Sequence, residues 1–154
     1  LNENIKIILN EEDILITDTQ TTVTSKLLKG EYVNYKGFFN KEPEEIHSIN
    51  NKDFIKELKY LKNFTTDKNK IIVWDRGNIE VNNENGIYES KLETEKTGTT
   101  DIKIGFNCEY MIEAIGQFKN NETIRINFVD KNSPIIIEDK NKNNKAFVLP
   151  VRIA

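Results

Sequence analysis

The chain has 154 residues, a mass of 17.9 kDa and a net charge of −3 at pH 7, and charged residues make up 31% of it. This length is enough for one full domain and part of a second. Positive and negative charges nearly balance, which excludes a protein that binds nucleic acid through its overall charge. A local basic face on the surface is still compatible with this composition. The single cysteine, Cys108, excludes a disulfide framework and a cysteine-rich metal cluster. No apolar run is long enough to span a bilayer and no signal-peptide pattern opens the chain, so we expect a soluble, cytoplasmic protein without a membrane partner.

The opening segment contains three strand-like runs, at residues 4–12, 13–20 and 22–32. They match the last three strands of the repeated unit described below, without the strand and helix that should precede them. Three strands alone leave an open sheet edge and a bare apolar face, which is unfavourable for an isolated protein. We therefore expect residues 1–41 to be the second half of a domain that begins outside this chain, and residues 40–43 to be a linker.

The remaining residues, 44–154, repeat one pattern twice, a strand and a helix followed by three strands. The first copy has strands at 45–49, 70–75, 78–83 and 87–96 and a helix at 50–64; the second has strands at 101–106, 123–129, 134–139 and 146–152 and a helix at 107–120. Such repetition is typical of two copies related by a pseudo-two-fold axis, with joined sheets and helices side by side. The sequence therefore predicts an α+β fold in which residues 44–154 form one complete domain.

The first helix of this domain has an apolar side and a basic side. Its apolar positions, Phe54, Leu58 and Leu61, fall within one narrow arc at 100° per residue. The opposite side carries four lysines, Lys52, Lys56, Lys59 and Lys62. Such a stripe is compatible with a solvated helix face, and also with a surface that attracts a polyanion independently of its sequence.

The second helix shows a different pattern. Its apolar stripe consists of Met111, Ile115 and Phe118, whereas its polar face carries Glu109, Glu113 and Gln117. If both helices face one polyanion, only the first contributes much attraction.

Residues suited to catalysis are scarce. His47 is the only histidine, and its position near the start of a strand predicts a surface or edge residue. Cys108 lacks a histidine partner nearby, although the dipole of the second helix could lower its pKa slightly. Trp74 lies in a strand and is expected in the core. The sequence thus predicts a protein that is not an enzyme, with no catalytic residues, no metal ligands and no cofactor.

Three stretches resemble one protein family. These are SKLLKGEYVNYKGFF (25–39), IGFNCEYMIEAI (104–115), and SPIIIED (133–139) together with FVLPVR (147–152). In order and spacing they are similar to the bacterial sliding clamp, the beta subunit of DNA polymerase III. The resemblance covers the whole chain, which would correspond to the second half of the clamp's middle domain and its complete C-terminal domain.

The resemblance implies a fold and a function. The fold is the DNA-clamp fold, with antiparallel sheets outside and helices lining the inner face. The function is that of a processivity factor, a head-to-tail homodimeric ring that encircles double-stranded DNA. Its partners would be the alpha subunit of DNA polymerase III, the clamp loader and repair proteins, which insert short apolar motifs into a hydrophobic pocket.

By motif match the resemblance assigns three sets of residues. The pocket positions are Val33, Phe38, Tyr110, Asn132, Pro134, Leu149, Pro150, Val151 and Arg152. Lys52, Lys56, Lys59 and Lys62 would face the DNA, and Phe64 and Thr65 would lie at the subunit interface. Without the resemblance, the apolar tail favours a plain final strand with its apolar residues buried in the last domain.

Several pocket positions depart from the family pattern. Val33 and Asn40 replace frequent prolines, Gly37 stands where an arginine often lies, and Asn132 replaces a small or apolar residue. We expect an altered peptide preference. Two alternatives remain open: a standalone clamp-like adaptor that binds peptides without encircling DNA, and an unrelated β-rich interaction domain.

Overall fold

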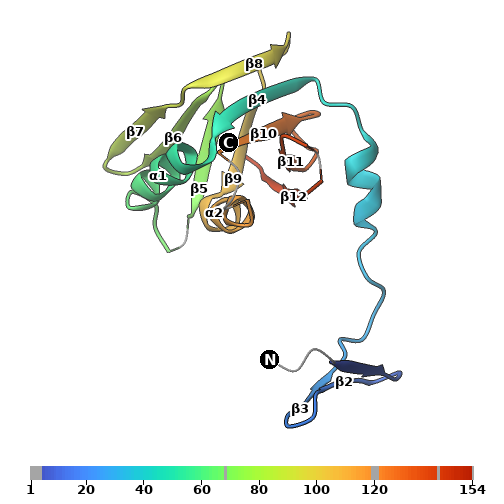
Figure 1. Cartoon of the computed structure of the whole chain (residues 1–154). Helices are drawn as coiled ribbons and strands as arrows, with labels where there is room; N and C mark the ends of the chain where they lie inside the picture. Colours follow the sequence, from blue (N-terminus) through green and yellow to red (C-terminus); the bar gives the residue numbers. More distant parts are fainter. Residues whose placement is uncertain (1–4, 68, 119–121, 142, 154) are drawn as a thin grey trace. The chain divides into compact units, whose positions relative to one another are not determined.

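The computed structural model describes residues 5–67, 69–118, 122–141 and 143–153. The chain divides into two units, Leu1–Tyr35 and Lys36–Ala154, which are described separately (Figure 1). Within the described residues, no helix is both long enough and apolar enough to cross a membrane.

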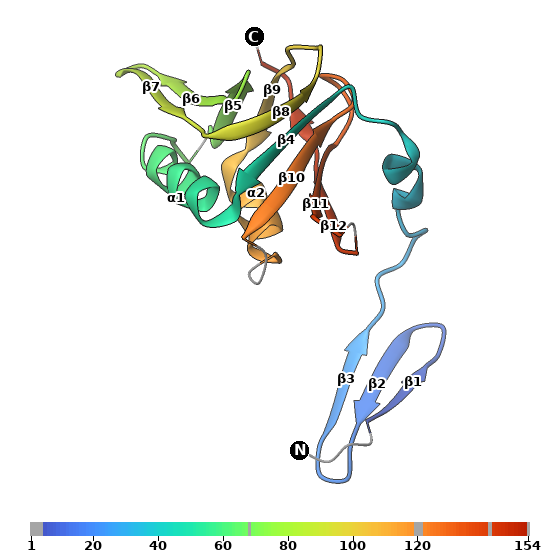
Figure 2. The same ribbon diagram turned by 45° about the horizontal axis from the view of Figure 1, so that its top comes forward.

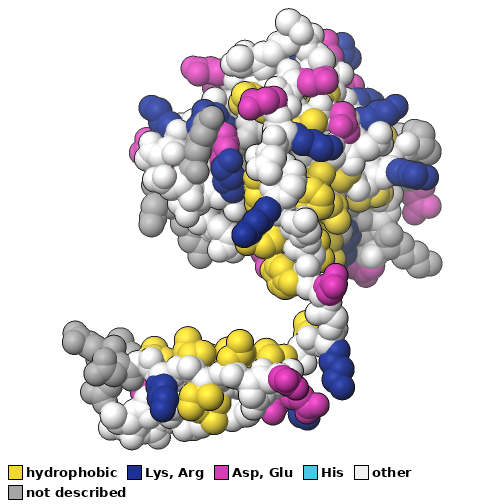
Figure 3. Space-filling view, turned by 90° about the vertical axis from the view of Figure 1, so that its right-hand side faces the viewer, with side chains coloured by type: hydrophobic (Ala, Val, Ile, Leu, Met, Phe, Trp, Pro, Cys, Tyr) yellow, Lys and Arg dark blue, Asp and Glu magenta, His cyan; other side chains and the backbone are white. Residues whose placement is uncertain are grey.

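The first unit is a three-stranded antiparallel sheet in the order β1 (Lys6–Leu9), β2 (Asp13–Thr17) and β3 (Thr22–Lys26). Its register places Ile7, Ile16 and Val23 in one row across the strands. These side chains are 63%, 38% and 55% exposed, and hydrophobic side chains gather along this sheet (Figure 3). The bare apolar face predicted from the sequence is therefore present in this unit, on strands shorter than predicted.

The second unit contains both repeats. Its elements in chain order are η1 (Tyr35–Asn40, which begins at the unit boundary), β4 (Glu45–Asn50), α1 (Asn51–Lys62), β5 (Ile71–Asp75), β6 (Asn78–Asn83), β7 (Gly86–Lys91), β8 (Thr94–Gly98), β9 (Lys103–Asn107), α2 (Cys108–Gly116), β10 (Thr123–Phe128), β11 (Ile135–Asp139), β12 (Lys145–Val148) and β13 (Pro150–Val151). The second helix was predicted to reach residue 120 but ends at Gly116; residues 119 and 120 lie outside the described residues.

The strands form two antiparallel five-stranded sheets, in the orders β12-β11-β10-β4-β8 and β7-β6-β5-β9-β13. Each sheet thus takes three strands from one repeat and two from the other, and the two orders are equivalent under exchange of the repeats. The helices α1 and α2 contact each other and lie side by side (Figures 1 and 2). The predicted repetition, joined sheets and paired helices are confirmed.

The sequence prediction was wrong for the closing strand of each repeat. Residues 87–96 were predicted as one strand, but they form β7 and β8, which belong to different sheets. Residues 146–152 likewise form β12 and β13 in different sheets, with Leu149 between them. Because strand periodicity does not reveal which sheet a segment joins, the sequence could not show that each closing segment crosses from one sheet to the other.

The core lies between the helices and the sheets. It includes Phe54 and Leu58 from α1, Met111 and Ile115 from α2, and Trp74 from β5, all at most 1% exposed. These apolar positions and the core position of Trp74 were predicted correctly from helical and strand periodicity.

The prediction that His47 lies at the surface or an edge is wrong, because the side chain is 1% exposed. Its ring lies edge-on to Trp74, with centroids 4.8 Å apart. Its Nε2 is 2.7 Å from Glu45 Oε1 and its Nδ1 is 2.8 Å from Thr94 Oγ1. Strand β4 is central in its sheet and alternates inward at Glu45, His47 and Ile49, so polar partners compensate for the burial of the ring.

Candidate functional site

The C-terminal tail is held against β9. Pro150 and Val151 form β13 and pair with Phe106 and Gly105. A Cβ atom on Gly105 would come within 2.6 Å of Ile153 Cγ2 and 2.9 Å of the Val151 carbonyl oxygen. The glycine of the IGFN segment therefore provides the space in which the tail crosses the sheet.

Leu149 is the point where the tail passes between the sheets. Val148 before it is buried in β12, Pro150 after it pairs with β9, and Leu149 itself remains 60% exposed. The tail is thus not a plain final strand with all its apolar residues buried, which was the alternative without the family resemblance. An exposed leucine fixed on both sides is a rigid apolar contact point on the surface of the second unit.

An aromatic group lies next to Leu149. Phe147 packs against Phe38 of η1, with ring centroids 5.2 Å apart, and against Phe39 at 5.9 Å. Phe147 also lines a surface hollow between α2 and β12, together with Tyr110, which is 64% exposed. Hydrophobic side chains gather over η1 and the neighbouring sheet edge (Figure 3). Phe147 was missing from the sequence assignment, although its period-two spacing from Leu149 could have indicated it.

The turn between β10 and β11 lines one groove together with the tail, through Lys131 and Asn132. The Oδ1 atom of Asp130 accepts hydrogen bonds from the amides of Asn132 and Ser133, both at 2.7 Å, and its Oδ2 accepts one from the Ser133 hydroxyl. These bonds lower the pKa of Asp130. Lys41 Nζ donates to Ser133 Oγ at 3.2 Å and so ties the segment after η1 to this turn.

The structure distributes the predicted pocket residues of the second unit over separate hollows. One groove is lined by Asn132, Pro150, Val151 and Arg152. Tyr110 lines a second hollow together with Phe147, and Phe38 packs against Phe147. Pro134 is half-buried next to the Asp130 turn. Val33 belongs to the first unit, where it is 66% exposed, and is therefore described apart from the others.

The four lysines of α1 are all exposed. In the described parts of the chain, Lys52 and Lys59 take part in no ion pair, and Lys56 has only a 3.6 Å contact with its neighbour Glu57. Lys62 differs, because its Nζ is 2.9 Å from Oε1 of Glu109 on α2.

Glu109 holds a second lysine as well. Its Oε2 accepts from Lys70 Nζ at 2.6 Å. Hydrogen bonds from Lys70 and Lys62 lower the pKa of Glu109 to about 2, and the bond to Glu109 raises the pKa of Lys70. The charge of α2 was noticed in the sequence, but this contact between the helices was not.

The predicted interface residues follow α1. Phe64 stacks on Tyr88 of β7 with centroids 3.9 Å apart, and its carbonyl accepts from Asn83 Nδ2 at 2.7 Å. The Thr65 hydroxyl donates to the Lys62 carbonyl at 2.8 Å. Phe64 therefore lies against β7, the outermost strand of its sheet, and Thr65 follows it after the end of α1.

Within the described ranges, no group of three or more His, Cys, Asp and Glu side chains is placed so that it could hold a metal ion. Cys108 is buried, and burial raises the pKa of its thiol. The expectation that the helix dipole would lower this pKa is wrong, because desolvation has the larger effect.

Comparison with known protein families assigns a family to the second unit of the chain. The family model for the C-terminal domain of the DNA polymerase III beta subunit matches residues 36–152. The chain belongs to the DNA polymerase III beta subunit family. The resemblance carried by the sequence motifs is therefore confirmed.

Relatives within the beta subunit family agree over the whole chain. The beta sliding clamp of Rickettsia felis is 25% identical over 170 residues, which cover 99% of this chain and 44% of that protein. The beta sliding clamp of Staphylococcus epidermidis is 25% identical over 166 residues, which cover 98% and 42%. The chain thus spans less than half the length of these relatives.

Solved structures of beta subunits share the fold. A sliding clamp from Bartonella birtlesii, bound to griselimycin, matches 97% of this chain and 41% of its own, with a TM-score of 0.82 and 25% identity. A DNA polymerase III beta subunit from Eubacterium rectale matches 99% of this chain and 42% of its own, with a TM-score of 0.82 and 24% identity. The predicted clamp fold is confirmed.

Proposed function

We propose that this chain forms the C-terminal part of a sliding clamp, a processivity factor without catalytic activity of its own. In this proposal, residues 1–41 are the second half of the clamp's middle domain and residues 44–154 its complete C-terminal domain. The whole protein encircles duplex DNA in the cytoplasm and tethers the replicative polymerase, the clamp loader and repair proteins. Family membership supports this role, because relatives that match nearly the whole chain are named beta sliding clamps.

The observation that carries the proposal is the geometry of the tail. Leu149 is exposed between two paired segments, next to the Tyr110–Phe147 hollow and the groove lined by Pro150, Val151 and Asn132. A preformed apolar surface of this kind binds a few apolar anchors with little loss of conformational entropy. It suits a short apolar peptide motif better than a folded substrate.

The DNA-facing role rests on α1. Its exposed lysines are long, flexible point charges, which attract phosphates without reading sequence. In the assembled ring these lysines face the central hole, and Phe64 and Thr65 lie where the next subunit joins head to tail.

Binding of griselimycin tests the peptide site, because the Bartonella birtlesii clamp binds this molecule. We expect the 154-residue chain to bind griselimycin in calorimetry, and Leu149→Asp to weaken binding by about tenfold or more. Ile87→Asp is the matched control, because Ile87 is 62% exposed and Leu149 is 60% exposed. No binding by the unmodified chain, or equal loss in both variants, would contradict a peptide site at the tail.

The mass of the native polypeptide tests the proposed assembly into a ring. We expect an antibody against this chain to capture from its source cell a protein much heavier than 17.9 kDa, with further domains preceding this sequence. A native protein of this size could not close the usual ring, and the adaptor function would then be the better explanation.

A further inference from the structure

We propose that Glu109 limits the attraction of the inner helix face for DNA by holding Lys62 and Lys70 in a three-residue ion cluster. The inference rests on the proposed DNA-facing role of α1 and deepens it. It assigns a role in setting DNA affinity to a residue on the neighbouring helix, which the motif comparison assigned to no site.

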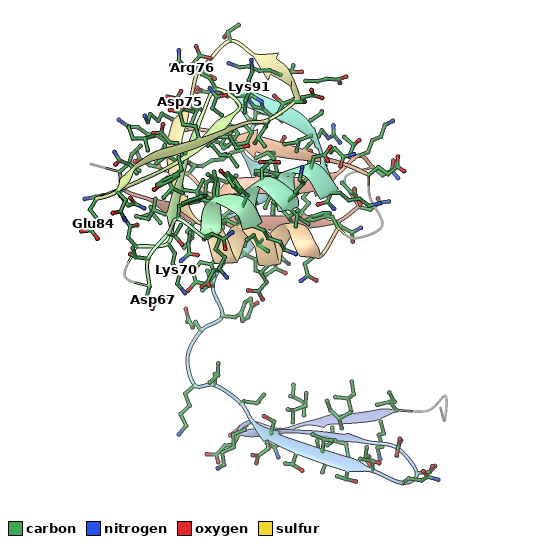
Figure 4. All side chains as sticks on the ribbon, turned by 90° about the vertical axis from the view of Figure 1, so that its left-hand side faces the viewer. Asp67, Lys70, Asp75, Arg76, Glu84 and Lys91 are labelled. Atoms are coloured by element: carbon green, nitrogen blue, oxygen red, sulfur yellow. The ribbon has the colours of Figure 1, made fainter. Side chains whose placement is uncertain are left out.

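The cluster joins three separate elements. Lys62 lies in the last turn of α1, Lys70 lies directly before β5, and Glu109 lies in the first turn of α2. Each lysine contacts a different oxygen of the carboxylate, at 2.9 Å and 2.6 Å. Figure 4 shows Lys70 and Asp67 at the end of β5 opposite to Asp75 and Arg76, beside the helices.

This arrangement divides the basic face into two classes of lysine. Lys52 and Lys59 have no ion pair within the described ranges, so their charges are available to phosphates. Lys62 and Lys70 share one carboxylate, so a phosphate must compete with Glu109 for them. All three members remain partly exposed, with side-chain exposures of 45%, 31% and 36%, and such ion pairs are readily exchanged for other partners.

The position of Glu109 keeps the carboxylate in place. It lies at the N-terminus of α2, where the helix dipole favours a negative charge. Asn107 caps this helix by accepting hydrogen bonds from the amides of Glu109 and Tyr110, at 2.9 Å and 3.3 Å. The cap fixes the backbone at Glu109, and the two ion pairs hold its carboxylate between Lys62 of α1 and Lys70. A clamp that must slide benefits from weak contacts, since each additional phosphate contact increases affinity and its dependence on salt.

The test is Glu109→Gln against Glu113→Gln, measured by fluorescence anisotropy with a labelled DNA duplex. Both variants remove one negative charge from α2, and Glu113 is exposed without an ion pair in the described part of the chain. We expect Glu109→Gln to tighten binding by about threefold to tenfold, and Glu113→Gln by less than about twofold. The slope of log affinity against log salt should become steeper by about 0.9 for each released lysine that reaches a phosphate.

A second pair of variants measures the coupling. Lys62→Gln should weaken DNA binding more in the Glu109→Gln background than in the unmodified chain, because only there is the lysine free. Circular dichroism checks that each variant retains the fold.

The outcomes separate this inference from the proposed function. The combined change of Lys52→Glu and Lys59→Glu reports on the DNA face itself, because neither lysine belongs to the ion cluster. If that change abolishes binding while Glu109→Gln and Glu113→Gln behave alike, the ion-cluster inference is overturned and the DNA face stands. If no variant binds DNA at low salt, or if Lys52→Glu with Lys59→Glu has no effect on binding, the ion-cluster inference and the DNA-facing role of α1 are both overturned.

Discussion

Gly105 shows how a single residue determines the shape of the candidate site. The space that a Cβ atom at this position would need is occupied by Ile153 and by the carbonyl of Val151. The glycine is required because the tail crosses directly over the strand, and its backbone angles are ordinary.

We expect Gly105→Ala to displace β13 and to destabilise the second unit by about 1–3 kcal/mol, because a methyl group must be accommodated in a filled space. Urea unfolding measures the stability, and hydrogen exchange at Val151 reports on the pairing of the tail. Gly116→Ala is the control, since its added Cβ would meet no heavy atom within 4 Å. Equal behaviour of the two variants would show that the tail does not need this space.

His47 shows the limit of reasoning from residue type. A lone histidine near a strand start is usually exposed, but here Glu45 and Thr94 provide partners for both ring nitrogens. Thr94 lies in β8 and pairs with Ile49 in the register of the two strands. The sequence could not reveal this, because β8 was hidden within a longer predicted strand.

At the scale of elements, the two repeats use the same device to begin their helices. Asn50 and Asn107 each end the first strand of a repeat, and each side chain accepts hydrogen bonds from two amides of the following helix. An asparagine at this position satisfies amides that have no partner within the helix. The device in the second repeat also positions Glu109 and Tyr110, which belong to the two proposed binding surfaces.

We expect Asn107→Ala to cost about 1 kcal/mol of stability, and Asn50→Ala a similar amount, because each removes one helix cap. The two variants should differ in binding: only Asn107→Ala should weaken griselimycin binding, since Tyr110 lies on α2. Urea unfolding and calorimetry on both variants check this. Equal loss of binding in both would mean that general destabilisation, rather than the position of Tyr110, is responsible.

At the scale of the whole molecule, the charged surface makes stability depend on pH. The pKa of Glu109 is lowered to about 2 from a usual value of 4.5. A carboxyl group with a lowered pKa in the folded state contributes stability that is fully present above its usual pKa and is lost as the pH falls through the folded value. The contribution of Glu109 is therefore present above about pH 4.5 and lost towards pH 2. The pKa of Asp130 and of Asp101 is lowered as well, so their contributions are lost in the same direction.

We expect the melting temperature to fall as the pH decreases from about 4.5 to 2, and Glu109→Gln to reduce this fall. Thermal melting followed by circular dichroism over this range measures the effect, with Glu113→Gln as the control of equal charge change. A pH profile that is the same for Glu109→Gln and the unmodified chain would contradict the ion cluster with Lys62 and Lys70.

The repeated pattern, the apolar faces of both helices and the family motifs can be read from the amino-acid sequence alone. These features are local: periodicity places Phe54 or Met111 on a buried face whatever the rest of the chain does. Other features became visible only in the folded chain: where each closing strand divides, the exposure of Leu149 between two sheets, the burial of His47, and the contacts of Glu109 with Lys62 and Lys70. Each of these features depends on which distant segments of the chain become neighbours. The repeats exchange strands, so strand pairing and core packing determine these neighbours, and the local sequence does not.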